Sequence, residues 1–134
     1  MDYINQAKHN KACASELAQT GRYKDWAVTA TFYSAIHYVE AGLEWMRRSH
    51  PNKNCPAGVS IHDVREAIVK SMFRNCYYQY RDLRIASQNA RYLQDNVAGS
   101  ASSYFTQAAV NEFITVNLQQ VQNEVERVAK CSLS

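Results

Sequence analysis

Four arginines occur in the segment 71–94, which the spacing of its apolar residues predicts to be one helix. Placed at 100° per residue, they fall in a sector of about 100° on one side of that helix, opposite the apolar stripe. The arginines are Arg74, Arg81, Arg84 and Arg91, and the stripe is Met72, Cys76, Leu83 and Ala90. Tyr77 and Tyr92 fall at or inside the edges of the arginine sector.

Guanidinium groups bind phosphate oxygens in pairs, and tyrosine rings can stack on bases. We therefore expect a phosphate-bearing ligand, RNA or a nucleotide, bound by Arg81, Arg84, Arg91, Tyr77 and Tyr92. The alternative is that these arginines pair with carboxylates of a neighbouring helix or of a second subunit, as on any charged helix surface.

A second set of polar residues lies at helical spacing among apolar neighbours. His37 and Glu40 are three residues apart within an almost wholly apolar segment, and His62 and Arg65 repeat that spacing. Ser87 is a further candidate, so these five residues could line a polar cleft. The alternative is a structural network that sets the register of the helices. Their separation resembles no zinc-ligand spacing, so we expect no metal site and no cofactor.

The chain lacks the motifs of common enzyme classes. It has no GxSxG, no HExxH and no glycine-rich phosphate loop. This absence argues against most enzyme mechanisms, although it leaves the question of catalysis open.

The spacing of apolar residues predicts an all-α fold. We expect helices over 3–19, from 24 or 25 to 48, from a Ser60 cap to 69 or 70, over 71–94, and over 103–130. The third and fourth helices could be continuous. The second helix is apolar nearly all round, which predicts burial on several sides. The prediction is a single domain, 1–134, built as an up-and-down bundle of four long helices plus one short helix.

Composition sets limits on the location of the protein. The chain has 134 residues with a net charge of +3, and its first residues lack the apolar core of a signal peptide. No run approaches the roughly 18 to 20 apolar residues that span a bilayer. The four cysteines lie in separate segments, so we expect free thiols and a cytoplasmic protein without membrane contact.

Three segments resemble the HEPN superfamily of small helical bundles. They are DWAVTATFYSAIHYVEAGL (25–43), IHDVR (61–65) and YRDLRIASQNARY (80–92). Many HEPN proteins are metal-independent ribonucleases that carry an Rx4–6H motif. No arginine of this chain has a histidine five to seven positions after it, so the resemblance transfers no catalytic residue.

The resemblance implies a HEPN-like module of a toxin–antitoxin or phage-defence system. It would bind RNA, a nucleotide or a protein partner such as a nucleotidyltransferase, as a homodimer, and would not be a standard HEPN ribonuclease. Two alternatives remain: a dimeric protein-interaction scaffold, and a divergent ribonuclease that uses Arg84 or Arg91 with His62 or His37.

Overall fold

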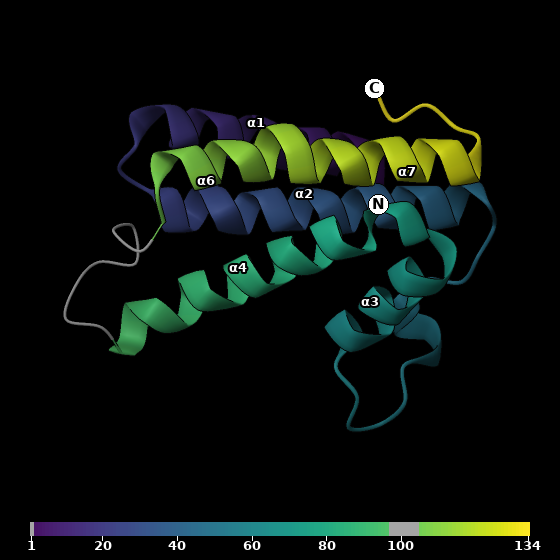
Figure 1. Cartoon of the computed structure of the whole chain (residues 1–134). Coiled ribbons are helices and arrows are strands. Elements are labelled where there is room, and N and C mark those ends of the chain that lie inside the picture. The colour runs from purple at the N-terminus through teal and green to yellow at the C-terminus, as the bar shows by residue number, and fades with distance from the viewer. Residues whose placement is uncertain (1, 97–104) are drawn as a thin grey trace.

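A computed structural model describes the backbone of residues 2–96 and 105–134, and the side chains of residues 2–91 and 105–134. Every regular element in these ranges is helical, which confirms the all-α class (Figure 1). The helices are α1 (Tyr3–Thr20), α2 (Lys24–Trp45), α3 (Ile61–Met72), α4 (Tyr77–Asn96), α6 (Gln107–Glu112) and α7 (Gln119–Ala129). Shorter helical segments are η1 (Pro51–Asn54), η2 (Arg74–Cys76) and η3 (Phe113–Leu118).

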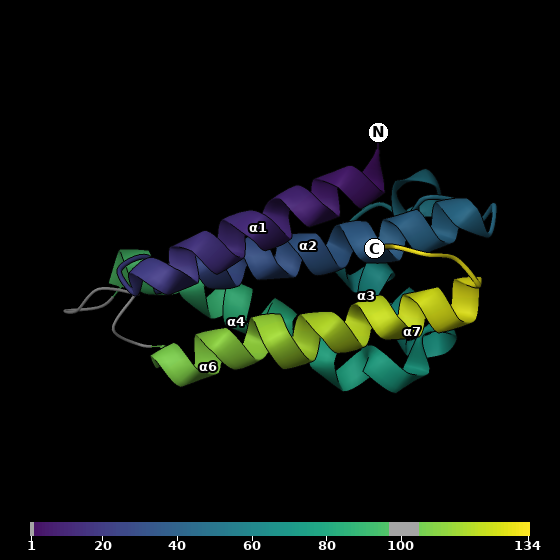
Figure 2. The same ribbon diagram turned by 90° about the horizontal axis from the view of Figure 1, so that it is seen from above.

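The long helices alternate in direction along the chain (Figure 1). Helices α6 and α7, joined through η3, form one rod, and Figure 2 shows α2 between this rod and α1. Helix α4 crosses beneath α2, and α3 projects at the far end of the molecule (Figure 1). Helix α1 buries only small side chains, Ala7, Ala14 and Ala18, which allow it to lie close against α2.

Two helix boundaries follow from local chemistry as predicted. Gly21 ends α1 in the left-handed conformation, with φ 69°, where glycine carries no penalty. The Ser60 side chain accepts the His62 backbone N–H at 3.1 Å and begins α3. Helix α2, in contrast, ends at Trp45 rather than at residue 48, because Arg47 turns the chain with a φ of 57°.

The predicted boundary between the third and fourth helices was wrong. Helix α3 continues to Met72, and α4 begins only at Tyr77, so Arg74 lies in η2 and outside the arginine helix. Phe73 is fully buried at this break. The Asn75 N–H, which the break frees, donates to the Glu124 carboxylate of α7 at 2.6 Å. Burial of the Phe73 ring and this hydrogen bond stabilise the interruption.

The predicted last helix, 103–130, begins outside the described residues, and its described part is α6, η3 and α7. The η3 segment is a π-helical turn, a local widening that often coincides with a special contact. Here Asn117, which is almost fully buried, donates to the Gln79 carbonyl of α4 at 3.3 Å.

The core lies between α2, α4 and the α6–η3–α7 rod, and Phe32, Phe73, Tyr80 and Leu118 are among its largest side chains. Helix α2 packs against α1, α4 and α7, which confirms the expected burial on several sides. Trp26 and Trp45 are 56% and 63% exposed, because one side of α2 faces away from the core. In the described part of the chain, no helix combines the length and apolarity needed to cross a membrane.

Candidate functional site

Glu40 is the centre of the polar residues that the fold brings together. Its side chain is only 5% exposed. Its Oε2 lies 3.2 Å from His37 Nδ1, one helical turn earlier on α2. Its Oε1 lies 2.8 Å from Arg65 Nη2 of α3 and 3.2 Å from His50 Nε2 of the loop before η1. Three segments of the chain therefore meet on one carboxylate.

Burial by itself would raise the pKa of Glu40, but the hydrogen bond from His37 and the charge of Arg65 lower it below its ordinary value. An ionised carboxylate only accepts hydrogen bonds, so His37 Nδ1 carries the proton that it donates to Oε2. His50 Nδ1 accepts the Asn52 N–H at 3.1 Å. In neutral His37, Nε2 remains as an acceptor.

Tyr3 covers this group of residues from α1. Its ring stacks on His37 and on His50, at centroid distances of 6.2 and 6.0 Å. Burial and the nearby carboxylates of Glu40 and Glu44 raise the pKa of Tyr3, so its hydroxyl stays protonated. The spacing of residues in the sequence did not predict that Tyr3 and His50 belong to this group. They lie at a chain end and in a loop, where no helical spacing links them to Glu40.

Arg65 joins Glu40 to His62, since its Nη1 lies 3.4 Å from His62 Nδ1. Burial lowers the pKa of His62, and the charges of Arg65, Arg84 and Arg91 lower it further against the opposing effect of Asp63. His62 is therefore neutral at pH 7. Because Nδ1 faces a guanidinium, which only donates, the imidazole proton belongs on Nε2.

Arg84 has the ion pairs that the alternative interpretation predicted. Its Nη2 lies 2.8 Å from Asp63 Oδ1 and its Nη1 lies 3.4 Å from Glu66 Oε1, both on α3. Arg91 and Arg81 are exposed and have no ion pair with any described side chain. The arginines of α4 thus divide into one that holds α3 and two that face solvent.

Helix α4 carries a row of four residues within about 60° on one side, at a spacing of four, three and four positions. They are Tyr80, Arg84, Ser87 and Arg91. Arg81 lies about 60° from Arg84, outside this row. Tyr77 is partly buried, with the Lys70 ammonium 5.5 Å from its ring centre. The side chain of Tyr92 lies outside the described residues.

Several polar atoms beside this row are buried and have no hydrogen-bond partner among the described residues. They are Arg65 Nε, Tyr80 Oη, Arg84 Nε and Ser87 Oγ. Burial raises the pKa of Tyr80 despite the opposing charges of Arg65 and Arg84, so its hydroxyl stays protonated. All four atoms can donate a hydrogen bond, and the two hydroxyl oxygens can also accept one.

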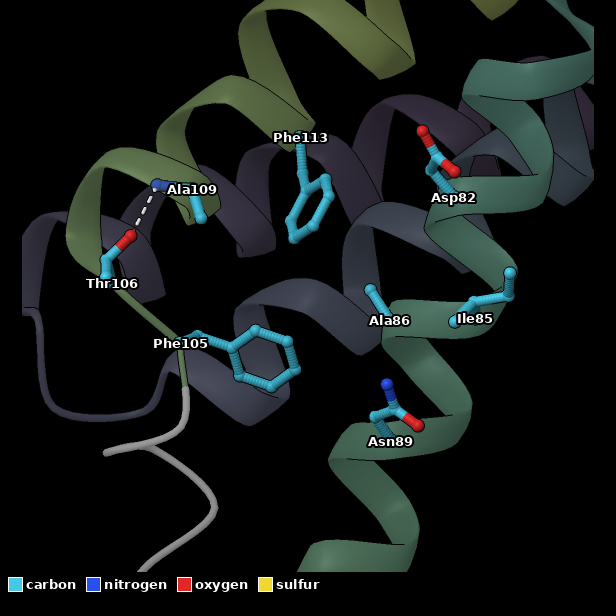
Figure 3. A pocket seen from close by; sticks show the side chains of 8 residues that line it. All are labelled: Asp82, Ile85, Ala86, Asn89, Phe105, Thr106, Ala109 and Phe113. Atoms are coloured by element: carbon cyan, nitrogen blue, oxygen red, sulfur yellow. Dashed lines mark hydrogen bonds between the residues drawn. The ribbon is translucent and has the colours of Figure 1, made fainter.

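Two cavities lie near these elements. One, of about 340 Å³, adjoins Glu40 and His50 and is bordered by the exposed cations Arg47, Arg48 and Lys53. The other, of about 410 Å³, lies between α4 and α6, where the rings of Phe105 and Phe113 point into the gap (Figure 3). This second cavity includes none of the predicted site residues.

The structure thus brings His37, Glu40, Arg65 and His62 into one series of contacts and places Arg84 and Arg91 close to its His62 end. Within the described residues, no three His, Cys, Asp or Glu side chains are arranged to hold a metal ion. Comparison with models of protein families, with curated proteins and with solved structures finds no match to this chain.

Proposed function

We propose that this chain binds a phosphate group of RNA or of a nucleotide at the α3–α4 cationic cluster, defined as His62, Arg65, Arg84 and Arg91. The single observation that supports this most is the contact of Arg65 Nη1 with His62 Nδ1 at 3.4 Å. Burial, together with the charges of Arg65, Arg84 and Arg91, lowers the pKa of His62. Its Nε2 proton and the guanidinium N–H groups are donors suited to phosphate oxygens.

The ion pairs of the cluster indicate which of its arginines can attract a phosphate. Arg65 is paired with Glu40, and Arg84 with Asp63 and Glu66, so the charge of these two arginines is largely compensated. Arg91 has no such partner among the described side chains. We therefore assign Arg91 the attraction of the phosphate, and His62 and Arg84 its orientation. Exposed Arg81 is available for a neighbouring phosphate of an RNA strand.

The proposed class is a HEPN-like binding module, which rests on the sequence resemblance together with the all-helical fold. A role in a toxin–antitoxin or phage-defence system, with a nucleotidyltransferase as a protein partner, belongs to the same proposal. The segments that carry the resemblance lie on three helices. Trp26 and His37 are on α2, His62 is on α3 and Arg91 is on α4.

Titration of a fluorescent single-stranded RNA at several salt concentrations tests the proposal. Each phosphate contact of a single strand contributes a slope of about −0.7 to the dependence of log K on log salt. With Arg91 and Arg81 as the cations that have no ion pair with a described side chain, we expect one or two contacts, and Arg91→Gln should lower the slope by about one contact. Lys53→Gln removes an exposed cation of the η1 segment and should leave the slope unchanged.

His62→Gln should weaken the binding without changing that slope, because His62 is neutral. Absence of RNA and nucleotide binding at low salt, or equal losses in the Arg91→Gln and Lys53→Gln variants, would contradict the proposal.

One observation favours a second candidate, the divergent ribonuclease. His37 has its Nδ1 proton held by Glu40 and its Nε2 left as an acceptor, which is the arrangement of an oriented general base. Incubation of labelled RNA with EDTA should then yield cleavage that His37→Gln abolishes. The exposed His9 of α1 provides the control, since His9→Gln should leave any such cleavage unchanged.

A further inference from the structure

The cavity between α4 and α6 has the size of a site for a small molecule. Its volume of about 410 Å³ lies within the roughly 300–1,000 Å³ that such sites occupy. Asp82 and Asn89 line it from α4, and Phe105, Ala109 and Phe113 line it from the opposite wall (Figure 3). Phe113 begins the π-helical turn η3, and such turns are frequent at functional sites. We call this space the α4–α6 cavity.

The charge of the α4–α6 cavity comes from one residue. Asp82 is the only charged residue among the described residues that line it, and Asp82 has no ion pair with any described side chain. A carboxylate accepts hydrogen bonds and attracts positive charge, so its complement is a cation with N–H donors. A phosphate or a carboxylate would be repelled at this position. The cavity therefore favours a positively charged ligand.

The two phenylalanine rings favour the same charge and also define the body of the ligand. Both rings point into the cavity from the wall that faces Asp82 (Figure 3). The face of an aromatic ring is partly negative, so it attracts an ammonium group, and it also packs well against another aromatic ring. Ile85 and Ala86 of α4 add apolar surface to the lining. The ligand should therefore be largely apolar or aromatic, with its charge at one end.

Asn89 provides a second polar group at the other end of the cavity. It lies seven positions after Asp82 on the same side of α4, which separates the two backbone positions by about 10 Å (Figure 3). Its side-chain amide can both accept and donate a hydrogen bond, and it has no hydrogen bond with any described residue. A ligand with a polar group at each end of an apolar body would contact both residues.

We propose that the α4–α6 cavity binds an aromatic amine, in which a short aliphatic chain joins an ammonium group to an aromatic ring. Asp82 pairs with the ammonium group, Phe105 and Phe113 contact the ring, and Asn89 accepts an N–H at the far end of the ring. The cavity lies on the side of α4 opposite Arg84 and Arg91. This site is therefore separate from the proposed phosphate site and does not depend on it.

The other cavities described above and on α1 match this ligand less well. The cavity beside Glu40 is bordered by Arg47, Arg48 and Lys53, which repel a cation. A cavity between α1 and α2 has aromatic residues, including Tyr33, but no Asp or Glu among its described lining residues. The α4–α6 cavity thus combines aromatic rings with a carboxylate that no described cation neutralises.

Titration with tryptamine, followed by the amide chemical shifts of the isotopically labelled chain, tests the proposal. Tryptamine has an ammonium group at one end and an indole N–H at the other. Tryptophol, in which a hydroxyl replaces the ammonium group, is the matched neutral probe. We expect tryptamine to bind with a dissociation constant of about 0.1–1 mM, as befits a ligand of its size. The shifts should concentrate on α4 and α6.

The variant Asp82→Asn separates the contribution of charge from that of apolar contact. Because Asp82 is exposed, its ion pair with the ligand should be worth a factor of about three to ten in affinity. Tryptophol should bind the wild-type chain more weakly than tryptamine by this factor, and Asp82→Asn should weaken tryptamine by the same factor. The affinity of tryptophol should be the same in both chains.

Ile85→Lys provides a second test, since it adds a cation to the cavity at a position that is 41% exposed. It should weaken tryptamine and change tryptophol little. Glu112→Gln is the matched control, because Glu112 is an exposed carboxylate next to Phe113 that does not line the cavity. Tyr33→Ala alters the aromatic cavity between α1 and α2. Both controls should leave the affinity for tryptamine unchanged, and circular dichroism verifies the fold of each variant.

The proposal is overturned if tryptamine causes no saturable shifts up to about 10 mM. Shifts that lie mainly outside α4 and α6, or a loss of affinity in Tyr33→Ala, would also overturn it. So would equal affinities of tryptamine and tryptophol, or an affinity for tryptamine that Asp82→Asn leaves unchanged or that Glu112→Gln lowers as much. None of these results bears on RNA binding by the α3–α4 cationic cluster, which the salt titration tests separately.

Discussion

Glu40 of α2 and Arg65 of α3 form a buried ion pair, in which Oε1 lies 2.8 Å from Nη2 and each side chain is 5% exposed. The same carboxylate accepts a hydrogen bond from His37 and lies 3.2 Å from His50 Nε2, so three side chains approach it. Figure 1 shows α3 at one end of the bundle, and this ion pair joins it to the core helix α2. The geometry of the α3–α4 cationic cluster therefore depends on it.

Removal of the negative member of this pair should destabilise the fold strongly. Glu40→Gln leaves the Arg65 guanidinium buried without its counter-charge, and breaking a buried pair in this way costs about 3–5 kcal/mol. Urea unfolding followed by circular dichroism measures the change in free energy of unfolding. The control is Glu44→Gln, one turn further along α2, where the side chain is exposed and the change should stay within about 0.5 kcal/mol. Equal effects of the two variants would show that the pair is not structural.

The two arginines of α4 should separate stability from binding. Arg84→Gln removes the ion pairs with Asp63 and Glu66, which are partly exposed, so a loss of up to about 1 kcal/mol is expected. Arg91→Gln should leave the free energy of unfolding unchanged, because Arg91 has no ion pair with a described side chain. Urea unfolding of both variants tests this contrast. A larger loss for Arg91→Gln than for Arg84→Gln would contradict it.

Stability should fall in two phases as the pH decreases. The pKa of His62 is lowered from its ordinary value of 6.5, so the unfolded chain binds this proton first, and stability decreases as the pH falls below about 6.5 towards the folded pKa. The pKa of Glu40 is lowered from 4.5, so the stability due to ionised Glu40 is lost as the pH falls below about 4.5 through the folded pKa.

Urea midpoints measured from pH 8 to pH 3 test these signs. His62→Gln should remove the first phase and keep the second. A midpoint in the wild-type chain that stays constant between pH 8 and pH 5, or rises as the pH falls through that range, would contradict the assignment of His62.

Gly42 should be required for the close approach of α2 to α7. A Cβ atom at this position would fall well inside van der Waals contact of Val125 Cγ1, with the Phe73 ring also near. Gly42→Ala should therefore lower the free energy of unfolding by about 1–3 kcal/mol, although alanine favours a helix more than glycine. Thermal unfolding measures this loss, and Val125→Ala in the same chain should recover part of it. A Gly42→Ala variant at least as stable as wild type would show that the helices can separate without cost.

Much of the fold could be predicted from the sequence because its signals are local. The Ser60 cap, the glycine at position 21 and the apolar spacing act over three or four residues, and these predicted the beginning of α3, the end of α1 and the all-α class. The i, i+3 spacing likewise placed His37 beside Glu40 and His62 beside Arg65, which the structure confirms. Each of these contacts lies within a single helix.

The arginine side of the fourth helix could be predicted only in part from the spacing of residues along the chain. Its angular pattern predicted one surface, but burial of Phe73 interrupts the helix and places Arg74 outside it. Whether Arg84 faces solvent or the carboxylates of α3 depends on how α3 folds back, which the spacing along α4 does not specify.

The sequence by itself therefore determined which segments are helical and which neighbours share a helix face, because backbone hydrogen bonds and side-chain periodicity are local. Only the tertiary structure decided that His50 and Arg65 meet on Glu40, that Tyr3 stacks on His50, and that Trp26 and Tyr33 face outwards. The physical reason is that such contacts join segments far apart in the chain, and they depend on how all the helices pack at once.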